Sequence, residues 1–287
     1  MTTVEAVILA IVEGITEFLP VSSTGHMILA EAALKMQKSA FTNVYIVNIQ
    51  FGAIVSVLFL YWRRFFQSFD FYFKLAVAFL PAAVLGFLLN DFIDSLLSSV
   101  TIVAISLLVG GVILIFTDKI FQDQIADIHE EDEKVLLKER DEFGVEVSRR
   151  VLRKFKISWL QAFLIGCYQC IAMIPGVSRS AATIIGGLQQ KLNIKRAAEF
   201  SFFLAVPTIT AAALYKLMKN FDVIRGTDVN VLLIGNVISF VVGMIAIKFF
   251  IGLITRYGLR FFGYYRIIVG IVILVMLALG HKLEIAE

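Results

Sequence analysis

Charged side chains are scarce in this sequence. They make up 17% of its 287 residues, whereas a soluble domain has roughly 25%. Long stretches carry no charge at all: residues 39–62, 95–117, 157–178 and 229–247, with shorter runs at 75–90 and 200–215. A membrane-spanning helix needs about 20 mainly apolar residues, and a spanning β-strand needs an alternating segment of about ten. Because the runs do not alternate, the sequence predicts a polytopic α-helical membrane protein and argues against a soluble domain or a β-barrel.

Cysteines, an N-terminal basic region and flexible linkers are also few or missing. Cys167 and Cys170 are the only cysteines, so they cannot build a disulfide framework. Their CxxC spacing also occurs in redox and metal sites, but their uncharged surroundings favour small packing residues. The first basic residue is Lys35, which is not typical of a cleaved signal peptide. Without Pro-rich or Gly/Ser-rich linkers, residues 1–287 are predicted to form one membrane domain.

Hydropathy and charge together predict the topology. Six segments are predicted to span the membrane: 43–62, 72–90, 98–117, 197–217, 229–252 and 262–281. A long stretch of mixed charge, residues 118–156, separates the third span from the fourth and is predicted to be a solvated cytoplasmic loop, partly helical. Other basic residues gather on the same side of the spans as this loop. The positive-inside rule therefore places that side in the cytoplasm and both termini outside.

Two further stretches, 4–36 and 157–190, are each interrupted by proline, in FLPVSST and MIPGVSRS. Proline removes a donor and disfavours helix in the residue before it, so each stretch is predicted to form two half-helices joined by a turn. Such turns occur at membrane depth where they are buried or line a cavity. Residues 1–117 and 157–287 each contain a broken helix followed by three spans. The predicted fold is therefore an all-α inverted-topology repeat with two re-entrant helix hairpins.

The first broken segment, EGITEFLPVSSTGH, combines acids, hydroxyls and a histidine. Glu13 and Glu17 are four residues apart and share a helix face. Paired acids in a membrane helix are costly, and they suit a divalent cation or a shared proton. Ser22 and His26 have the same spacing, which suits a nucleophile and its base, or a nucleophilic histidine beside a donor. The alternative is that Ser22 and Ser23 cap the second half-helix.

The second broken segment, PGVSRSAAT, has the features of an anion site. Gly176 permits a tight turn, and Ser178 and Ser180 lie where a new half-helix begins, with its free N–H groups and positive dipole end. Arg179 adds a guanidinium that can bind phosphate or carboxylate with two hydrogen bonds, and Thr183 lies one turn further along. Acids, hydroxyls, a histidine and an arginine are the groups that phosphoryl transfer requires.

The two motifs resemble those of the bacitracin-resistance family of undecaprenyl-diphosphate phosphatases. Glu13 and Glu17 match the family's pattern of two glutamates separated by three residues. Residues 175–183 match its Pro-Gly-x-Ser-Arg-Ser-x-x-Thr pattern at every position. The resemblance extends along the whole chain, including EFSFFLAVP at 199–207, and only the charged loop 118–156 departs from it by its length.

The resemblance implies an enzyme that removes the terminal phosphate of undecaprenyl diphosphate, supported by Mg²⁺ or Ca²⁺. It implies that Glu13 and Glu17 bind the metal or handle protons. It also implies that the nucleophile and its partner are among Ser22, Ser23 and His26. The residues implied to bind the diphosphate are Gly176, Ser178, Arg179, Ser180 and Thr183. The nucleophile remains open among a serine, His26 and metal-activated water, with Ser23 assisted by His26 preferred.

Two other functional classes compete with this interpretation. A secondary transporter or flippase for an anionic lipid phosphate would share the broken helices but needs no hydroxyl–histidine pair. Membrane lipid phosphatases that use two histidines are disfavoured, because the only histidine after Arg179 is His281. The expected partners are a polyprenyl diphosphate and membrane lipid, with no nucleic acid. The expected location is the bacterial inner membrane with the site facing outward; the oligomeric state is open, a homo-oligomer included.

Overall fold

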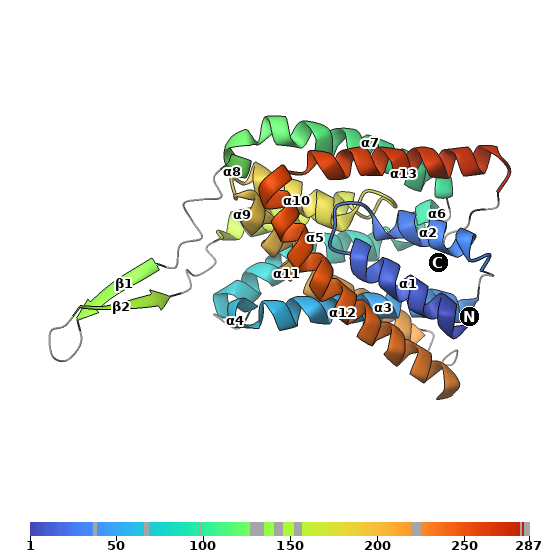
Figure 1. Ribbon diagram of the computed structural model, residues 1–287, viewed down its shortest axis with the longest axis horizontal. Coiled ribbons are helices and arrows are strands. Elements are labelled where there is room, and N and C mark those ends of the chain that lie inside the picture. Colours follow the sequence, from blue (N-terminus) through green and yellow to red (C-terminus); the bar gives the residue numbers. More distant parts are fainter. Residues whose placement is uncertain are drawn as a thin grey trace.

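The computed structural model describes residues 1–36, 39–65, 69–97, 99–126, 135–140, 146–151, 157–219, 226–281 and 283. Within these ranges the regular secondary structure consists of helices and one β-hairpin (Figure 1). The helices are α1 (Thr3–Thr16), α2 (Ser23–Ala33), α3 (Ala40–Leu60), α4 (Trp62–Phe65), α5 (Phe69–Leu88), α6 (Asn90–Leu97), α7 (Val100–Ile120), α8 (Gln122–Ala126), α9 (Trp159–Ile171), α10 (Arg179–Gln189), α11 (Ile194–Lys219), α12 (Gly226–Tyr257) and α13 (Arg260–Ala278).

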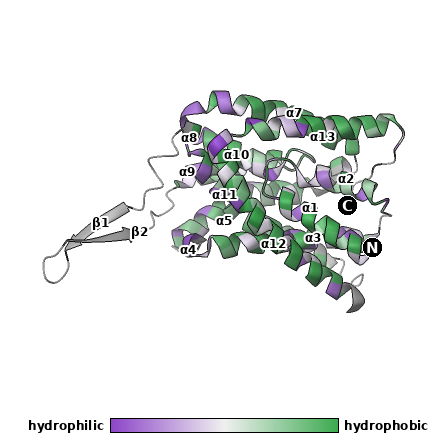
Figure 2. Cartoon of the chain, in the orientation of Figure 1, coloured by the Kyte–Doolittle hydropathy of each residue, from purple (hydrophilic) through white to green (hydrophobic). Residues whose placement is uncertain are grey.

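Six of these helices are long and apolar enough to cross a membrane: α3, α5, α7, α11, α12 and α13. They correspond to the six predicted spans, which are thereby confirmed. Hydrophobic residues predominate along these helices (Figure 2), and many of the large ones are exposed, such as Phe73 and Phe87 on α5. Large apolar side chains on an outer surface are stable in lipid rather than water. The chain is therefore a multi-pass membrane protein.

Both proline-containing segments are broken as predicted, between α1 and α2 and between α9 and α10. The two pairs share local features. Each first helix begins with a capping box, and each second helix begins after a serine with positive φ, 70° at Ser22 and 75° at Ser178. Positive φ recurs at Lys35 and Lys191, which lie as far apart in the sequence as the two serines. These matches favour a repeat; its inverted orientation and its division into 1–117 and 157–287 stay predictions.

Equivalent helices make equivalent contacts. α1 packs on α12, and α9 packs on α5. Both contacts use a glycine, because a Cβ on Gly14 would lie 2.8 Å from Val242 and one on Gly166 would collide with the backbone of Ala78. Small residues let membrane helices approach closely. α7 and α13 lie side by side along the edge of the bundle (Figure 1), so the breaks between the half-helices are enclosed by full-length spans.

The charged loop differs from its prediction in secondary structure. α8 is the only helix within the described part of residues 121–156. β1 (Val135–Arg140) and β2 (Glu146–Val151) form an antiparallel hairpin that pairs Val135 with Val151. β-branched valines at the strand ends and in β2 favour strand over helix. The expected partial helix is thus present at α8, whereas the two strands were not predicted; the rest of the loop lies outside the described residues.

An aromatic core supports the first turn. Phe18 follows Glu17 and is fully buried, and its ring meets Phe202 edge-on, with centroids 5.4 Å apart. Phe202 and Phe250 continue the cluster into α12. Edge-to-face aromatic pairs pack rigidly and stabilise a core beyond the area that they bury. The irregular backbone after α1 is therefore held in place by side chains of α11 and α12.

Candidate active site

The first broken pair places two acids and a serine around one turn. α1 ends at Thr16, and the chain then turns through Pro20 to Ser22. The Ser22 hydroxyl accepts a hydrogen bond from the N–H of Gly25 at 3.5 Å, so Ser22 caps α2. Positive φ is unusual for a residue with a side chain, and such backbone strain is concentrated at functional sites. The turn leaves Ser23, the first residue of α2, facing back toward α1.

The second broken pair repeats this construction around an arginine. Gly176 has φ of 88°, and a Cβ there would lie 2.9 Å from Cα of Val103, so only glycine fits the turn. The Ser178 hydroxyl accepts from the N–H of Ala181 at 3.3 Å and caps α10. Arg179 is the first residue of that helix, in the same position that Ser23 occupies in α2.

The two turns meet through Glu17. Its Oε2 accepts a hydrogen bond from the hydroxyl of Ser23 at 3.0 Å, and its Oε1 lies 3.3 Å from Nη2 of Arg179. The Nη1 atom of Arg179 donates to the backbone carbonyl of Ser201 at 2.9 Å. The side chains of Glu17 and Arg179 are only 7% and 12% exposed. Ser23, Glu17 and Arg179 therefore form one connected, largely buried polar group.

Glu13 lies one helical turn before Glu17 and is completely buried. It interacts electrostatically with both Glu17 and Arg179. Its two carboxylate oxygens have no hydrogen-bond partner among the described residues. A buried acceptor without a partner is costly in free energy, so this carboxylate is suited to a ligand that supplies positive charge or a proton.

The hydroxyls of the second motif bind protein groups. Ser180 donates to the carbonyl of Leu19 at 2.8 Å, which ties the second turn to the first, and its oxygen lies 3.0 Å from that of Ser178. Thr183 donates to the hydroxyl of Ser201 at 2.7 Å, or to the carbonyl of Arg179 at 2.8 Å. These contacts fix the start of α10. Contact of the three hydroxyls with a diphosphate stays a prediction.

His26 lies apart from the serine hydroxyls. Its Nδ1 lies 2.8 Å from the carbonyl oxygen of Ser22, and its Nε2 lies 2.8 Å from the hydroxyl of Tyr265. A carbonyl can only accept, so Nδ1 carries a proton, and Nε2 of the neutral ring accepts from Tyr265. Both ring nitrogens are thus occupied by groups other than a serine hydroxyl, and the structure pairs Ser23 with Glu17 instead of His26.

Arg266 is the residue that sequence reasoning missed. It lies on α13 and is completely buried. Its guanidinium donates to the carbonyls of Pro20 at 3.2 Å and Val177 at 2.8 Å, one in each turn. Further bonds reach carbonyls of Gly176, Ser106 and Leu107. An arginine inside an apolar span is itself a signal of function or of a buried polar network, and here it holds both turns together.

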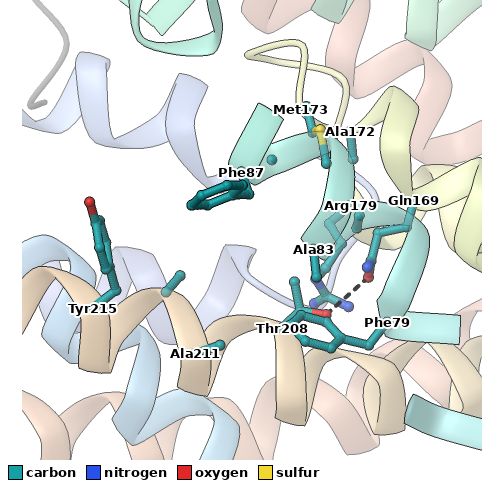
Figure 3. A pocket seen from close by; sticks show the side chains of 13 residues that line it. Phe79, Ala83, Phe87, Gln169, Ala172, Met173, Arg179, Thr208, Ala211 and Tyr215 are labelled. Atoms are coloured by element: carbon teal, nitrogen blue, oxygen red, sulfur yellow. Dashed lines mark hydrogen bonds between the residues drawn. The ribbon is translucent and has the colours of Figure 1, made fainter. Parts of the chain in front are cut away.

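A cavity of about 660 Å³ opens beside this group, between α5, α9, α10 and α11. Arg179, Gln169 and Thr208 lie together at one end of it, among apolar side chains (Figure 3). Within the described residues, no cluster of three or more histidines, cysteines or acids forms a ready-made metal site. Arg179 therefore lies at the end of an apolar cavity and also contacts Glu17, which accepts a hydrogen bond from Ser23.

The family model for bacitracin resistance protein BacA matches residues 6–272. The chain belongs to the BacA bacitracin-resistance family. A relative from Bdellovibrio bacteriovorus, named undecaprenyl-diphosphatase, is 51% identical over 99% of each chain. Relatives of the same name from Flavobacterium johnsoniae and Aquifex aeolicus are 49% and 40% identical, over 99% and 95% of this chain and 100% and 97% of their own. The predicted family resemblance is confirmed, and all residues of the candidate site described above lie within the range matched by the BacA family model.

Proposed function

We propose that this chain removes the terminal phosphate of undecaprenyl diphosphate and leaves undecaprenyl phosphate and inorganic phosphate. The observation that carries the proposal is the hydrogen bond of 3.0 Å from the Ser23 hydroxyl to Glu17, whose other oxygen contacts Arg179. A nucleophile, a base and a phosphate-binding cation are thereby assembled from two distant segments. The name that the relatives carry supplies the substrate, and the membrane location fits its long hydrocarbon chain.

The geometry favours a two-step reaction at Ser23. Glu17 takes the hydroxyl proton while Ser23 Oγ forms a bond to the terminal phosphorus. The bond from that phosphorus to the bridging oxygen breaks, and its electron pair leaves with undecaprenyl phosphate. Water then attacks the phosphoserine and Glu17 returns the proton to Ser23, while the proton of the water leaves with inorganic phosphate. His26 is not needed as the base.

Arg179 supplies the positive charge. Negative charge spreads over the oxygens of the transferred phosphoryl group, and a preorganised guanidinium stabilises it strongly in a site that excludes water. The carbonyl of Ser201 and the carboxylate of Glu17 fix two of its nitrogens. Because side chain and partners are already in place, little reorganisation is needed when the substrate binds.

A divalent cation, Mg²⁺ or Ca²⁺, fits the two acids. Mg²⁺ is commonly held by one or two carboxylates, with substrate phosphates and water completing its coordination. Glu13 offers two buried oxygens without a hydrogen-bond partner in the described chain, and Glu17 lies one turn away. We propose that these two residues hold the cation. When bound, it would neutralise charge on the diphosphate.

We also propose that the protein lies in the bacterial inner membrane with its site open to the outer side. The positions of the helix ends and of the basic residues support this orientation. The ends of α7 and α9 that adjoin the charged loop lie opposite the start of α1 and the end of α13 (Figure 1). Basic residues cluster on the loop side, which the positive-inside rule places in the cytoplasm. α1, which carries Glu13 and is followed directly by Glu17, would then enter from the outer face.

Phosphate release tests the proposal. Purified protein in detergent is supplied with undecaprenyl diphosphate and Mg²⁺, and Ser23→Ala, Glu17→Gln and Arg179→Lys are compared with the wild type. Ser39→Ala is a control, since Ser39 is a serine at the start of a different helix, α3, where its hydroxyl accepts from the N–H of Thr42. We expect release by wild type and control and a loss in the three variants of about 10²-fold or more. A folded wild type that binds the lipid without releasing phosphate would favour the transporter hypothesis.

A further inference from the structure

The cavity beside Arg179 has an apolar wall and one polar end. Alanine, glycine, phenylalanine and methionine side chains form most of the wall, and no acidic residue lines it among those described. Gln169 and Thr208 lie near Arg179 at the polar end, whereas Tyr215 lies on the far side (Figure 3). A cavity of this composition suits a molecule with an anionic head and a hydrocarbon tail.

Gln169 carries a free donor at this polar end. The residue is 3% exposed, and its side chain contacts Thr208, whose Oγ1 lies 3.3 Å from Oε1. Thr208 is the one hydrogen-bond partner found for this amide in the described chain, where Nε2 has none. Since the amide has two N–H groups, at least one stays free whichever way it is turned. A buried donor without a partner is unfavourable, and it points to a ligand that accepts from it.

Arg179 presents a second free donor. Its Nη1 and Nη2 bind Ser201 and Glu17, while its Nε is buried and has no partner among the described residues. The two terminal nitrogens of the guanidinium therefore bind protein groups, and its Nε–H remains available as a donor beside the cavity. Two free donors, one of them charged, with no acid in the cavity wall, favour an anion such as phosphate.

We infer that Gln169 is a substrate-binding residue, which donates a hydrogen bond to the phosphate that stays on the lipid. The inference rests on the proposed function: the terminal phosphate lies at Ser23, and Arg179 bridges it to the retained phosphate. A cavity of about 660 Å³ is in the range that encloses a small ligand, so it takes only the first isoprene units. Phe87 and Tyr215 line it and are 86% and 60% exposed, which leaves a path for the remaining chain into the bilayer.

The repeat gives a chemical reason for an amide here. The number of residues from Glu13 to Gln169 equals the number from Ser22 to Ser178, the two serines with positive φ. The two halves therefore place a carboxylate and an amide at equivalent positions. A carboxylate attracts a cation, whereas only an amide can donate to a phosphate without repelling it. The change from Glu to Gln separates a cation-binding side of the site from a phosphate-binding side.

The test measures binding of the product, undecaprenyl monophosphate, which retains the phosphate in question. Thermal stabilisation by added monophosphate gives its affinity independently of hydrolysis. The variants are Gln169→Leu and the nearly isosteric Gln169→Glu, with Gln189→Leu as a matched control at an exposed glutamine of α10. We expect affinity to fall about ten-fold or more in Gln169→Leu and further in Gln169→Glu, with KM for the diphosphate rising in parallel and kcat changing little. The control is expected to bind like the wild type.

The outcomes separate this inference from the proposed function. Phosphate release by the wild type, with unchanged monophosphate binding in Gln169→Glu and Gln169→Leu, would overturn the inference and leave the phosphatase standing. If the leucine variant does not fold, the glutamate variant decides. Monophosphate binding that depends on Gln169, in a wild type that releases no phosphate, would support the binding site and overturn the proposed hydrolysis.

Discussion

Arg179 and Glu17 are 162 positions apart in the sequence, yet Nη2 of the arginine lies 3.3 Å from Oε1 of the glutamate. Each residue comes from a different broken-helix pair, so neither half of the chain contains the site alone. The polar group of Ser23, Glu17 and Arg179 forms only where the two turns meet. We therefore expect substitutions at these residues to affect stability and activity together.

The first prediction concerns this buried ion pair. Arg179→Met should destabilise the protein by about 3–5 kcal/mol, because it leaves the Glu17 carboxylate buried without its cation. Adding Glu17→Gln removes that charge, so the double variant should be more stable than Arg179→Met alone. Thermal unfolding in detergent measures both. Lys74→Met is the control, since Lys74 pairs with the exposed Asp70 and its loss should cost under about 1 kcal/mol. Equal stability of the single and double variants would show that the pair is not coupled.

The second prediction compares the expected nucleophile, Ser23, with His26. Ser23→Ala should lower kcat at least about 10³-fold, because it removes the attacking oxygen. His26→Ala should lower it by about ten-fold or less, because His26 binds Ser22 and Tyr265 and acts on the turn only indirectly. Initial rates of phosphate release at saturating substrate measure the difference. Equal losses in the two variants would show that His26 is as important for the reaction as Ser23 and would contradict the indirect role expected for the histidine.

Arg266 gives the third prediction. Arg266→Met should destabilise the protein by at least about 3 kcal/mol, since carbonyls of both turns lose their donor inside the protein. Gly110→Ala should also weaken the turns, because a Cβ at Gly110 would collide with the guanidinium. Unfolding temperature and phosphate release should fall together in both variants. Arg256→Met, at an exposed arginine near the end of α12, is the control. Full activity in a stable Arg266→Met protein would show that the turns hold without it.

The cavity gives the fourth prediction. Ala83→Phe adds bulk to its wall and should exclude the first isoprene units. KM should rise about ten-fold for undecaprenyl diphosphate but little for isopentenyl diphosphate, whose single unit leaves most of the cavity empty. Kinetics with the two substrates side by side measure the ratio. A rise of equal size for both would mean that the substitution disturbs the site as a whole.

Metal removal gives the fifth prediction. EDTA should abolish phosphate release, and excess Mg²⁺ should restore it. Glu13→Gln should raise the Mg²⁺ concentration for half-maximal activity about ten-fold or more, because one of the two carboxylates is lost. Glu5→Gln provides the control, as Glu5 caps the start of α1 far along the same helix. Full activity in EDTA would show that the reaction does not need a divalent cation.

Much of the fold follows from short-range features of the sequence. Apolar length places the spans: the third was expected at 98–117 and occupies Val100–Ile120. Proline and glycine place the breaks, because their effect on the backbone is local. The hairpin in the charged loop was not predicted, since mixed charge gives little indication of helix or strand.

The partners within the site depend on tertiary packing, which sequence spacing does not reveal. The spacing of Ser22 and His26 suggested a nucleophile and base, yet the fold turns His26 toward Tyr265 on α13. Glu17 was expected at a metal, and it also accepts from Ser23 across the turn. Arg266 could have been noticed as a charge inside the last span, but its carbonyl partners come from three separate segments.

Covalent trapping shows whether Ser23 carries the phosphoryl group during the reaction. Undecaprenyl diphosphate labelled with ³²P in the terminal phosphate is mixed with the wild type, quenched with acid within one turnover and digested, and the labelled peptide is sequenced. We expect phosphoserine at Ser23 and no labelled peptide from Ser23→Ala. Label on His26, or rapid phosphate release by Ser23→Ala, would contradict this expectation.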